Sequence, residues 1–396
     1  MSSQSPKRIA VIATIYTYLS HAQHFADRFL VGYPVKGGWH RPSIQIASLY
    51  VDQKPAGDQS LDRAREFGFA VYPTVAEALR CGGDRLAVDG VLIIAEHGEY
   101  ADNEKGQKLY PRYELFKECV TVFEQDGQSV PIYNDKNLSY SFSKGLEMVA
   151  DAHRLGFSIL AGSSLPVTWR LPDLELPLDC EIEEALMVGV GGSDAMDYHA
   201  LEAMQSMIER RMGGETGVKA VQLIEGDAVW EAGKQGRYST QLLISALSRG
   251  DSPQGLTLHD GRTQDLVGTG ELFKLVKNPS AYFIEHRDGL KTTLLMLNGA
   301  IGDFCFAARI KGDPNPHSTQ FFLPPTPPVT YSACLVSKIE ELITTGQSPI
   351  PAERTLTVCG ILDYSLTSKQ QGGRRIETPD HQVKYRAPAT SQHAQD

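Results

Sequence analysis

The chain has 396 residues, of which 41% are hydrophobic and 22% are charged, and its formal net charge is −10. This length allows two domains with full cores, and the acidic balance argues against nucleic acid or an anionic membrane as the main partner. No apolar run approaches the roughly 18 residues of a membrane span, and no signal-peptide pattern precedes the first apolar run. Six scattered cysteines without a CxxC pair indicate reduced thiols. These features predict a cytoplasmic globular protein.

The first 165 residues alternate between strand patterns and helix patterns. Strands are predicted at 8–14, 43–51, 69–72, 88–95, 130–133 and 158–161. Helices are predicted from Ser20 onward and at 60–68, 75–80, 113–126 and 141–155. The run VDGVLIIA at 88–95 is continuously apolar, as expected for a strand covered on both faces. This alternation predicts an α/β fold, with a Rossmann-like, doubly wound parallel sheet over residues 1–165.

The composition changes near Pro166, where several prolines mark a domain junction. Strands are predicted at 181–190, 218–224, 282–285, 291–297, 303–311 and 320–323, and helices at 197–212, 330–344 and 353–365. Residues 166–386 are therefore expected to form an α+β domain with an open antiparallel sheet. The strands at 291–297 and 303–311 are expected to form a homo-oligomer through that sheet, and residues 387–396 are expected to be a disordered tail.

The turn after the first strand lacks glycine. A dinucleotide-binding unit has G-x-G-x-x-G there, because the backbone must approach a pyrophosphate closely. Here the turn Ile15–Leu19 has the sequence IYTYL, so either the cofactor is held differently or the fold serves other chemistry. Thr14 and Tyr16 are the candidate cofactor contacts on this turn. Asp52, after the second strand, is placed to bind a ribose hydroxyl.

Polar residues cluster where the next strands end. Glu96, His97 and Glu99 follow the apolar run 88–95 directly, and such groups perform acid–base catalysis or bind a divalent cation. His21 and His24 have the i, i+3 spacing of one helix face and can share a metal. The sequence thus leaves open a metal site formed by these five residues together with His40.

Two further segments suggest proton transfer. Lys136 follows the strand at 130–133, where it can hold a substrate hydroxyl or carboxylate. In the second half, the segment 191–199 has two glycines, then Asp194, Asp197 and His199 before a helix. An aspartate bonded to a histidine fixes the tautomer of the imidazole and raises its basicity.

In this order, the motifs resemble those of the glucose–fructose oxidoreductase / inositol dehydrogenase (Gfo/Idh/MocA) family. The segment Asn134–Lys136 is similar to the family's Glu-Lys-Pro motif, 191–199 to its glycine-acid-histidine motif, and Arg354–Ser368 to its closing helix. The resemblance extends to about residue 385. It implies a Rossmann domain followed by a domain whose open antiparallel sheet lines the substrate pocket. It also implies NAD(P)-dependent oxidation or reduction of a sugar or cyclitol carbinol, with Lys136 as the matching lysine.

The sequence departs from the family pattern at four motifs. The glycine fingerprint is absent, Asn137 replaces the proline after the lysine, and Ala195 stands four residues before His199, where members of the family usually have an aspartate. The segment 96–100 replaces the family's usual loop after the apolar strand. Which aspartate pairs with His199 therefore stays open. Our first hypothesis is an NAD(P)-dependent oxidoreductase acting on a sugar, cyclitol or related polyol. The alternatives are a non-redox carbohydrate lyase, hydrolase or epimerase, with or without a divalent metal, and a catalytically inactive binding protein. The predicted catalytic residues are Lys136, His199, Asp194 and Asp197, and the predicted cofactor contacts are Thr14, Tyr16, Asp52, Glu96, His97 and Lys136.

Overall fold

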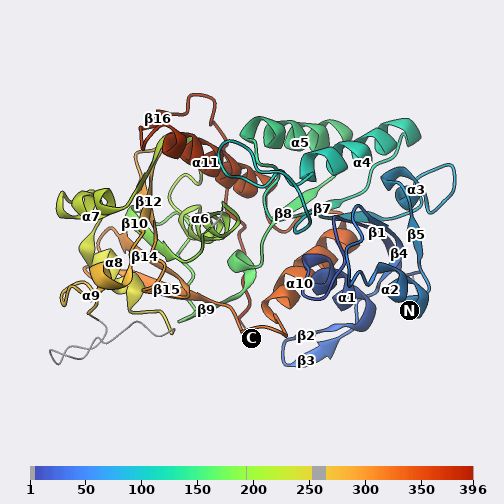
Figure 1. The fold of residues 1–396 in the computed structure, drawn as a ribbon, viewed down its shortest axis with the longest axis horizontal. Helices are drawn as coiled ribbons and strands as arrows, with labels where there is room; N and C mark the ends of the chain where they lie inside the picture. Colours follow the sequence, from blue (N-terminus) through green and yellow to red (C-terminus); the bar gives the residue numbers. More distant parts are fainter. Residues whose placement is uncertain (1–4, 193, 252–264, 396) are drawn as a thin grey trace.

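A computed structural model describes residues 5–192, 194–251 and 265–395. Ser193, within the glycine-acid-histidine segment 191–199, lies outside the described residues. Figure 1 shows two domains side by side, each built on one large sheet. All six cysteines lie in the described ranges and keep their thiols, without a disulfide bond.

The first sheet has six parallel strands, and its order confirms the predicted Rossmann-like fold. The strands are β1 (Lys7–Ala13), β4 (Ile44–Val51), β5 (Ala70–Tyr72), β6 (Gly90–Ile94), β7 (Ile132–Asp135) and β8 (Ile159–Gly162). Their order is β5-β4-β1-β6-β7-β8, which is the doubly wound order with its switch point between β1 and β6. Every residue of β6 is buried, as its unbroken apolar sequence predicted.

Helices cover both faces of this sheet. The helices of this half of the chain are α1 (His21–Val31), α2 (Ser60–Phe67), α3 (Val75–Arg80), α4 (Arg112–Asp126) and α5 (Phe142–Leu155). Helices α3, α4 and α5 pack on one face, and α1 packs on the other. Helix α10 (Tyr331–Thr345), which we assigned to the second domain, returns to pack beside α1. The chain therefore crosses between the domains more than once, as Figure 1 shows.

The second sheet has eight strands and is mostly antiparallel, in the order β16-β11-β12-β13-β10-β14-β15-β9. Its strands are β9 (Trp169–Leu171), β10 (Ile182–Gly189), β11 (Val218–Glu225), β12 (Ser280–His286), β13 (Lys291–Met296), β14 (Phe304–Ile310), β15 (His317–Phe322) and β16 (Ile376–Glu377). The strands predicted at 282–285 and 291–297 are present as β12 and β13, which pair in an antiparallel hairpin. One pair, β10 with β13, is parallel, so the sheet is mixed.

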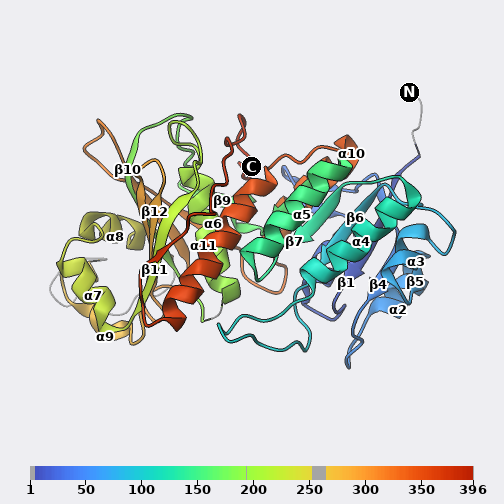
Figure 2. The same ribbon diagram turned by 90° about the horizontal axis from the view of Figure 1, so that it is seen from above.

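Both faces of the second sheet are covered, which corrects the basis of the predicted oligomer. Helices α6 (Asp194–Ile208) and α11 (Ala352–Gln370) pack on the face turned toward the first domain. Helices α7 (Asp227–Lys234), α8 (Thr240–Leu247) and α9 (Glu271–Leu275), which sequence patterns did not reveal, pack on the other face, as Figure 2 shows. Apolar side chains of β13 and β14 lie under these helices. The strands that we expected to contact a second copy are thus covered by helices of the same chain.

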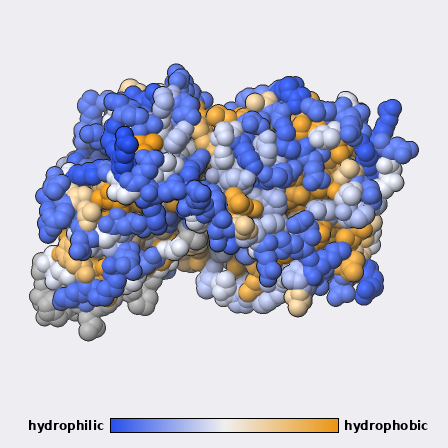
Figure 3. Space-filling view, turned by 45° about the horizontal axis from the view of Figure 1, so that its top comes forward, coloured by the Kyte–Doolittle hydropathy of each residue, from blue (hydrophilic) through white to orange (hydrophobic). Residues whose placement is uncertain are grey.

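Residues 387–395 are packed rather than disordered, contrary to our expectation for residues 387–396, of which Asp396 lies outside the described residues. The side chain of His393 is fully buried and bonds Asp173 and Glu175, and the Ala394 amide donates to the Val167 carbonyl at 3.0 Å. The glycine-rich connection after α1 is also ordered, as a small hairpin of β2 (Tyr33–Val35) and β3 (Gly38–His40). No helix in the described ranges has the length and apolarity needed to cross a membrane. Figure 3 shows hydrophilic residues over most of one face of the molecule.

Candidate functional site

The carboxyl edge of the first sheet holds a buried cluster of charges. Glu96, just after β6, accepts from Lys136 Nζ at 3.0 Å and also pairs with Arg112 at the start of α4. The three residues are only 5–7% exposed. Burial alone would raise the pKa of Glu96, but the charges of Lys136 and Arg112 outweigh it and lower that pKa. The carboxylate is therefore ionised, and it fixes two cations at the place where ligands bind in such sheets.

Two residues of this cluster have strained backbones. His97 has φ +69° and Lys136 has φ +61°, in the left-handed region that side chains with a Cβ seldom occupy. Each costs of order 1–3 kcal/mol unless glycine replaces it, and such strain gathers at functional sites. Lys136 directly follows β7, and His97 lies three residues after the end of the neighbouring strand β6. The backbone therefore supports the sequence-based choice of these two residues.

Three imidazoles form a row beside the charges. His21 Nδ1 bonds the buried Asp135 carboxylate at 2.7 Å, and the His21 ring lies 5.1 Å from that of His97 and 6.1 Å from that of His24. Burial, followed by the charge of His21, lowers the pKa of both His97 and His24 to about 4. These two rings are therefore neutral at pH 7, and Nδ1 of His97 is a buried nitrogen without a hydrogen-bond partner in the described part of the chain.

Helix α6 brings the second domain to this cluster. The Tyr198 hydroxyl donates to the Lys136 carbonyl at 3.2 Å, which ties the helix to the strained turn. Burial first, and then the charge of Lys136, lowers the pKa of His199 well below its ordinary value. Its Nδ1 is buried and has no hydrogen-bond partner among the described residues. A neutral imidazole with a free ring nitrogen therefore lies within the electrostatic reach of Lys136.

Neither predicted aspartate partner bonds His199. Asp197 instead accepts from the Tyr282 hydroxyl of β12, and burial raises the pKa of Asp197 to about 6. Asp194 lies where the charges of Arg112, Glu96 and Lys136 act on it, and burial raises its pKa. Asp194 thus faces the charge cluster, whereas Asp197 holds α6 to the second sheet.

The predicted cofactor contacts on the first turn are engaged within the protein. The Thr14 hydroxyl donates to the Glu96 carbonyl at 2.9 Å, and the fully buried Tyr16 donates its hydroxyl to Asp27 at 2.6 Å. The Tyr16 carbonyl accepts from the Gln59 amide at 2.7 Å. The turn therefore folds inward and is covered by the segment that follows β4.

That segment and the loop after β6 also bind each other. Asp52 accepts from the Tyr50 hydroxyl at 3.0 Å and from the Tyr100 hydroxyl at 2.6 Å, so both of its oxygens are engaged. Gln53 and Glu99 exchange two hydrogen bonds of 2.9 and 3.1 Å. A Cβ on Gly98 would lie 3.5 Å from the Ile15 side chain and 2.8 Å from the Tyr100 ring. These contacts join the loop after β4 to the loop after β6 beside the first turn.

These residues do not fit a nicotinamide dinucleotide held as in a glycine-turn Rossmann domain. That mode needs a glycine turn against the pyrophosphate and an acid free for the ribose. Here the buried Tyr16 lies in the turn in place of a glycine. The hydroxyls of Tyr50 and Tyr100 donate to the two carboxylate oxygens of Asp52, the acid that would bind the ribose.

The metal alternative has no geometric support in the described part of the chain, where no three His, Cys, Asp or Glu side chains form a group that can hold a metal. His40 pairs with Glu340 of α10 at 2.8 Å, and Glu99 is exposed. Only His21, His24, His97 and Glu96 of the six predicted ligands meet in the cluster, and His21 bonds Asp135.

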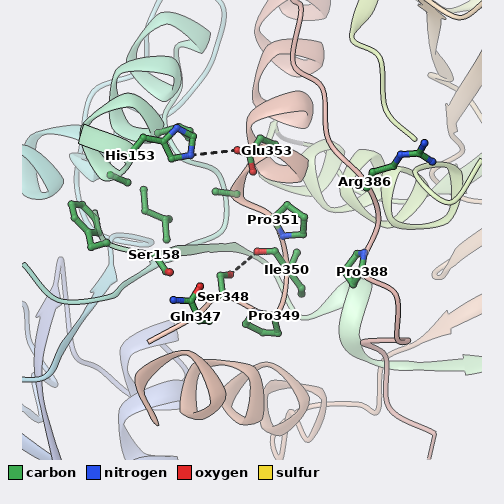
Figure 4. Close-up of a pocket in the computed structure, with 15 residues that line it drawn as sticks. His153, Ser158, Gln347, Ser348, Pro349, Ile350, Pro351, Glu353, Arg386 and Pro388 are labelled. Carbon is green, nitrogen blue, oxygen red and sulfur yellow. Dashed lines mark hydrogen bonds and ion pairs between the residues drawn. The ribbon is translucent and has the colours of Figure 1, made fainter. Parts of the chain in front are cut away.

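A separate cavity of about 420 Å³ lies at the opposite edge of the first sheet, near the start of β8 (Figure 4). Ser158, the loop at 347–351 and the tail residues Arg386 and Pro388 line it, and His153 and Glu353 face each other across it at 3.6 Å. Because ligands of such sheets bind at the carboxyl edge, we do not assign this cavity to the site.

Sequence reasoning missed Arg112 and Asp135 as members of the site. Arg112 is the first residue of α4, where its charge opposes the helix dipole. An arginine at that position indicates a nearby anion that pairs with it, and this anion is Glu96. Asp135 was visible beside Lys136, but only the fold shows that His21 binds it.

No family model matches the sequence, and no curated protein matches it. Solved structures match nearly the whole chain in fold. GenD2 from gentamicin A biosynthesis, in complex with NAD, is 13% identical, with a TM-score of 0.55 over 96% of this chain and 98% of its own. Myo-inositol dehydrogenase from Lactobacillus casei, in complex with NAD(H) and myo-inositol, is 10% identical, with a TM-score of 0.54 over 94% and 96%.

A probable dehydrogenase from Thermotoga maritima is also similar, at 10% identity and a TM-score of 0.54 over 93% of this chain and 98% of its own. At such identities the likeness concerns the fold and not the substrate or the reaction. The chain has the two-domain fold of the Gfo/Idh/MocA-type dehydrogenases, as the order of its motifs predicted.

Proposed function

We propose that the chain is an enzyme that moves a proton on a carbohydrate-like polyol. The observation that supports this is the buried Lys136–Glu96 pair at the carboxyl edge of the sheet, with the neutral His199 on α6 beside it. In this proposal His199 takes the proton from the carbon next to a carbonyl or carboxyl group of the substrate, because Nδ1 of its ring has no hydrogen-bond partner among the described residues. Lys136 donates to the substrate oxygen on which negative charge develops, and Glu96 keeps that ammonium positioned.

Asp194 and His97 have supporting roles in this proposal. Both lie at the cluster, and burial raises the pKa of Asp194 and lowers that of His97 to about 4. The Asp194 carboxylate and the neutral His97 ring each accept a hydrogen bond from a substrate hydroxyl, and Lys136 donates one. A polyol has many hydroxyls that both donate and accept, and it suits such a mixed set of groups.

The strained turns argue against a binding protein without catalysis. A scaffold gains nothing from left-handed backbones at His97 and Lys136, which glycine would adopt at no cost. Retaining the two side chains despite this cost favours a chemical role for them.

Two reactions use these groups. The first is NAD(P)-dependent oxidation or reduction of a sugar or cyclitol, and the fold of the NAD-bound neighbours supports it. When bound, the cofactor would supply the hydride acceptor or donor, and Lys136 and His199 would handle the carbinol proton. The second is a non-redox reaction, in which the same groups move a proton for a carbohydrate lyase, epimerase or hydrolase.

The hydrogen bonds that the first turn makes within the protein favour the non-redox reaction. Tyr16 and Asp52, where a dinucleotide would need open backbone and a free carboxylate, are bonded within the protein. We therefore propose the non-redox reaction as the function that the geometry supports best.

Proton NMR in D₂O with the purified protein and a panel of sugars, cyclitols and sugar acids tests this proposal. We expect deuterium incorporation or a new product without added NAD(P), and we expect Lys136→Met and His199→Gln to abolish it. Lys144→Met, on the surface of α5, is the matched control. Turnover that appears only with NAD(P) would instead establish the oxidoreductase reaction.

A further inference from the structure

A second recess opens next to the histidine row, on the outer side of α1. It has a volume of about 320 Å³, within the range of small-ligand pockets. Its walls come from α1, from the β2–β3 hairpin and from the loop that precedes α10. Two aromatic rings line it and are largely exposed, Tyr18 at 62% and Trp39 at 63%. Exposed aromatic rings on the walls of a recess suit a ligand with a flat apolar face.

The recess also contains a cation without a carboxylate partner. Arg28 lines it and donates only to backbone carbonyls: to His24 at 2.5 Å, to Pro328 at 2.8 Å and to Val329 at 3.0 Å. None of the ion pairs among the described residues includes Arg28. Its Nε is a buried donor that has no hydrogen-bond partner within the described ranges.

The neighbouring carboxylate does not neutralise this cation. Asp27 is held by both Nε and a terminal nitrogen of Arg63, each at 3.0 Å, and also accepts from Tyr16. Burial lowers the pKa of Arg28 by more than the nearby Tyr331 and Asp27 raise it. A partly buried cation of this kind is stabilised by an anion, and a guanidinium matches a carboxylate in geometry.

We propose that this recess binds a sugar ring bearing a carboxylate, a hexuronic acid unit, with its apolar face on Trp39 and Tyr18 and its carboxylate on Arg28. The ring hydroxyls would face Gln23 and His24 on α1. Neutral sugars lack the anion that Arg28 needs, and simple carboxylates lack the ring face.

The recess adjoins the proposed catalytic cluster through His24. Its ring lies 6.1 Å from that of His21, which bonds Asp135 next to Lys136. A uronate here would be one unit of a larger substrate whose other unit reaches Lys136. This extension rests on the proposed function, whereas binding of the uronate alone does not.

Titration calorimetry of the full chain with glucuronate, glucose and acetate tests the recess. We expect glucuronate to bind, and glucose and acetate to bind at least tenfold more weakly. We expect Trp39→Ala and Arg28→Gln each to weaken glucuronate binding at least tenfold. Trp230→Ala on α7 and the exposed Arg65→Gln on α2 are the matched controls and should leave it unchanged.

Arg28→Gln also removes contacts to the loop at 328–329, so Trp39→Ala, an exposed position, is the decisive variant if the first fails to fold. Glucuronate that binds no better than glucose, or equally to Trp39→Ala and the wild type, would overturn the assignment. Lys136→Met should retain glucuronate binding. If Lys136→Met loses turnover while Trp39→Ala binds glucuronate like the wild type, the catalytic proposal stands and the recess is rejected. If Trp39→Ala loses glucuronate binding while Lys136→Met keeps full turnover, the recess stands and the catalytic proposal is rejected.

Discussion

The two halves of the carboxyl edge of the first sheet differ in what their polar groups do. Beyond β6 and β7, Glu96, Lys136 and Arg112 are buried, and two unpartnered histidine nitrogens lie among them. Beyond β1 and β4, Tyr16 and Asp52 are fully engaged with their own chain. The same fold thus keeps one half prepared for a ligand and fills the other. Fold likeness alone does not reveal this division.

The largest effect is expected from Lys136→Met. This substitution removes a hydrogen-bond donor and its charge from the edge beyond β6 and β7. Turnover should fall about 10²- to 10⁴-fold, which is the usual contribution of a positioned acid–base group. Turnover of the NMR-identified substrate checks this, with Lys144→Met as control. Unchanged turnover in Lys136→Met would remove the site from this half.

The next effect concerns stability. Arg112→Met leaves the buried Glu96 with one cation instead of two, and breaking a buried pair costs about 3–5 kcal/mol. Urea unfolding measures the loss. Arg65→Met, which breaks an exposed pair with Asp62, should cost less than about 1 kcal/mol. Equal losses would show that the Glu96 cluster is no more than surface charge.

The histidine row predicts a pH dependence of stability. The pKa of His97 and of His24 is about 4 in the folded protein, below the unfolded value of 6.5. The unfolded chain therefore binds more protons between these values, so stability is full above pH 6.5 and falls toward pH 4. We expect a loss on the order of 1–3 kcal/mol between pH 7.5 and 5.

His97→Gln should reduce this pH slope in urea unfolding. His153→Gln, at an exposed position on α5, should leave it unchanged. A slope that is the same in His97→Gln and in the wild type would show that His97 is not held neutral by its surroundings.

The smallest effect is expected at the filled half. Tyr16→Phe removes one hydrogen bond to Asp27, which keeps its bonds to Arg63, so it should cost about 1 kcal/mol in unfolding. Turnover should change less than twofold, because this half has no role in the proposed reaction. A large loss of turnover would show that Tyr16 contributes to the site.

Apolar periodicity predicted all strands of the first sheet, because a fully buried strand such as β6 has an unbroken apolar sequence. In the second sheet it missed the two short edge strands β9 and β16. It missed α7, α8 and α9, since these short helices follow no long amphipathic pattern and are placed by packing on the second sheet. Strand ends located Glu96 and Lys136, but the partner of Glu96 on α4 and the engagement of Asp197 by Tyr282 depend on contacts between distant segments. The tail resembled disorder in composition, yet His393 is buried against Asp173.

The measurement that tests the division most directly is calorimetric titration of the purified protein with NAD(H) and NADP(H). Because the side chains of the first turn are bonded within the protein, we expect no binding at millimolar NAD(H) or NADP(H). We also expect proton exchange on a carbohydrate-like polyol when no cofactor is added. Micromolar binding of either cofactor would contradict it, since Tyr16 and Asp52 would then have to release their partners, and the oxidoreductase reaction would take its place.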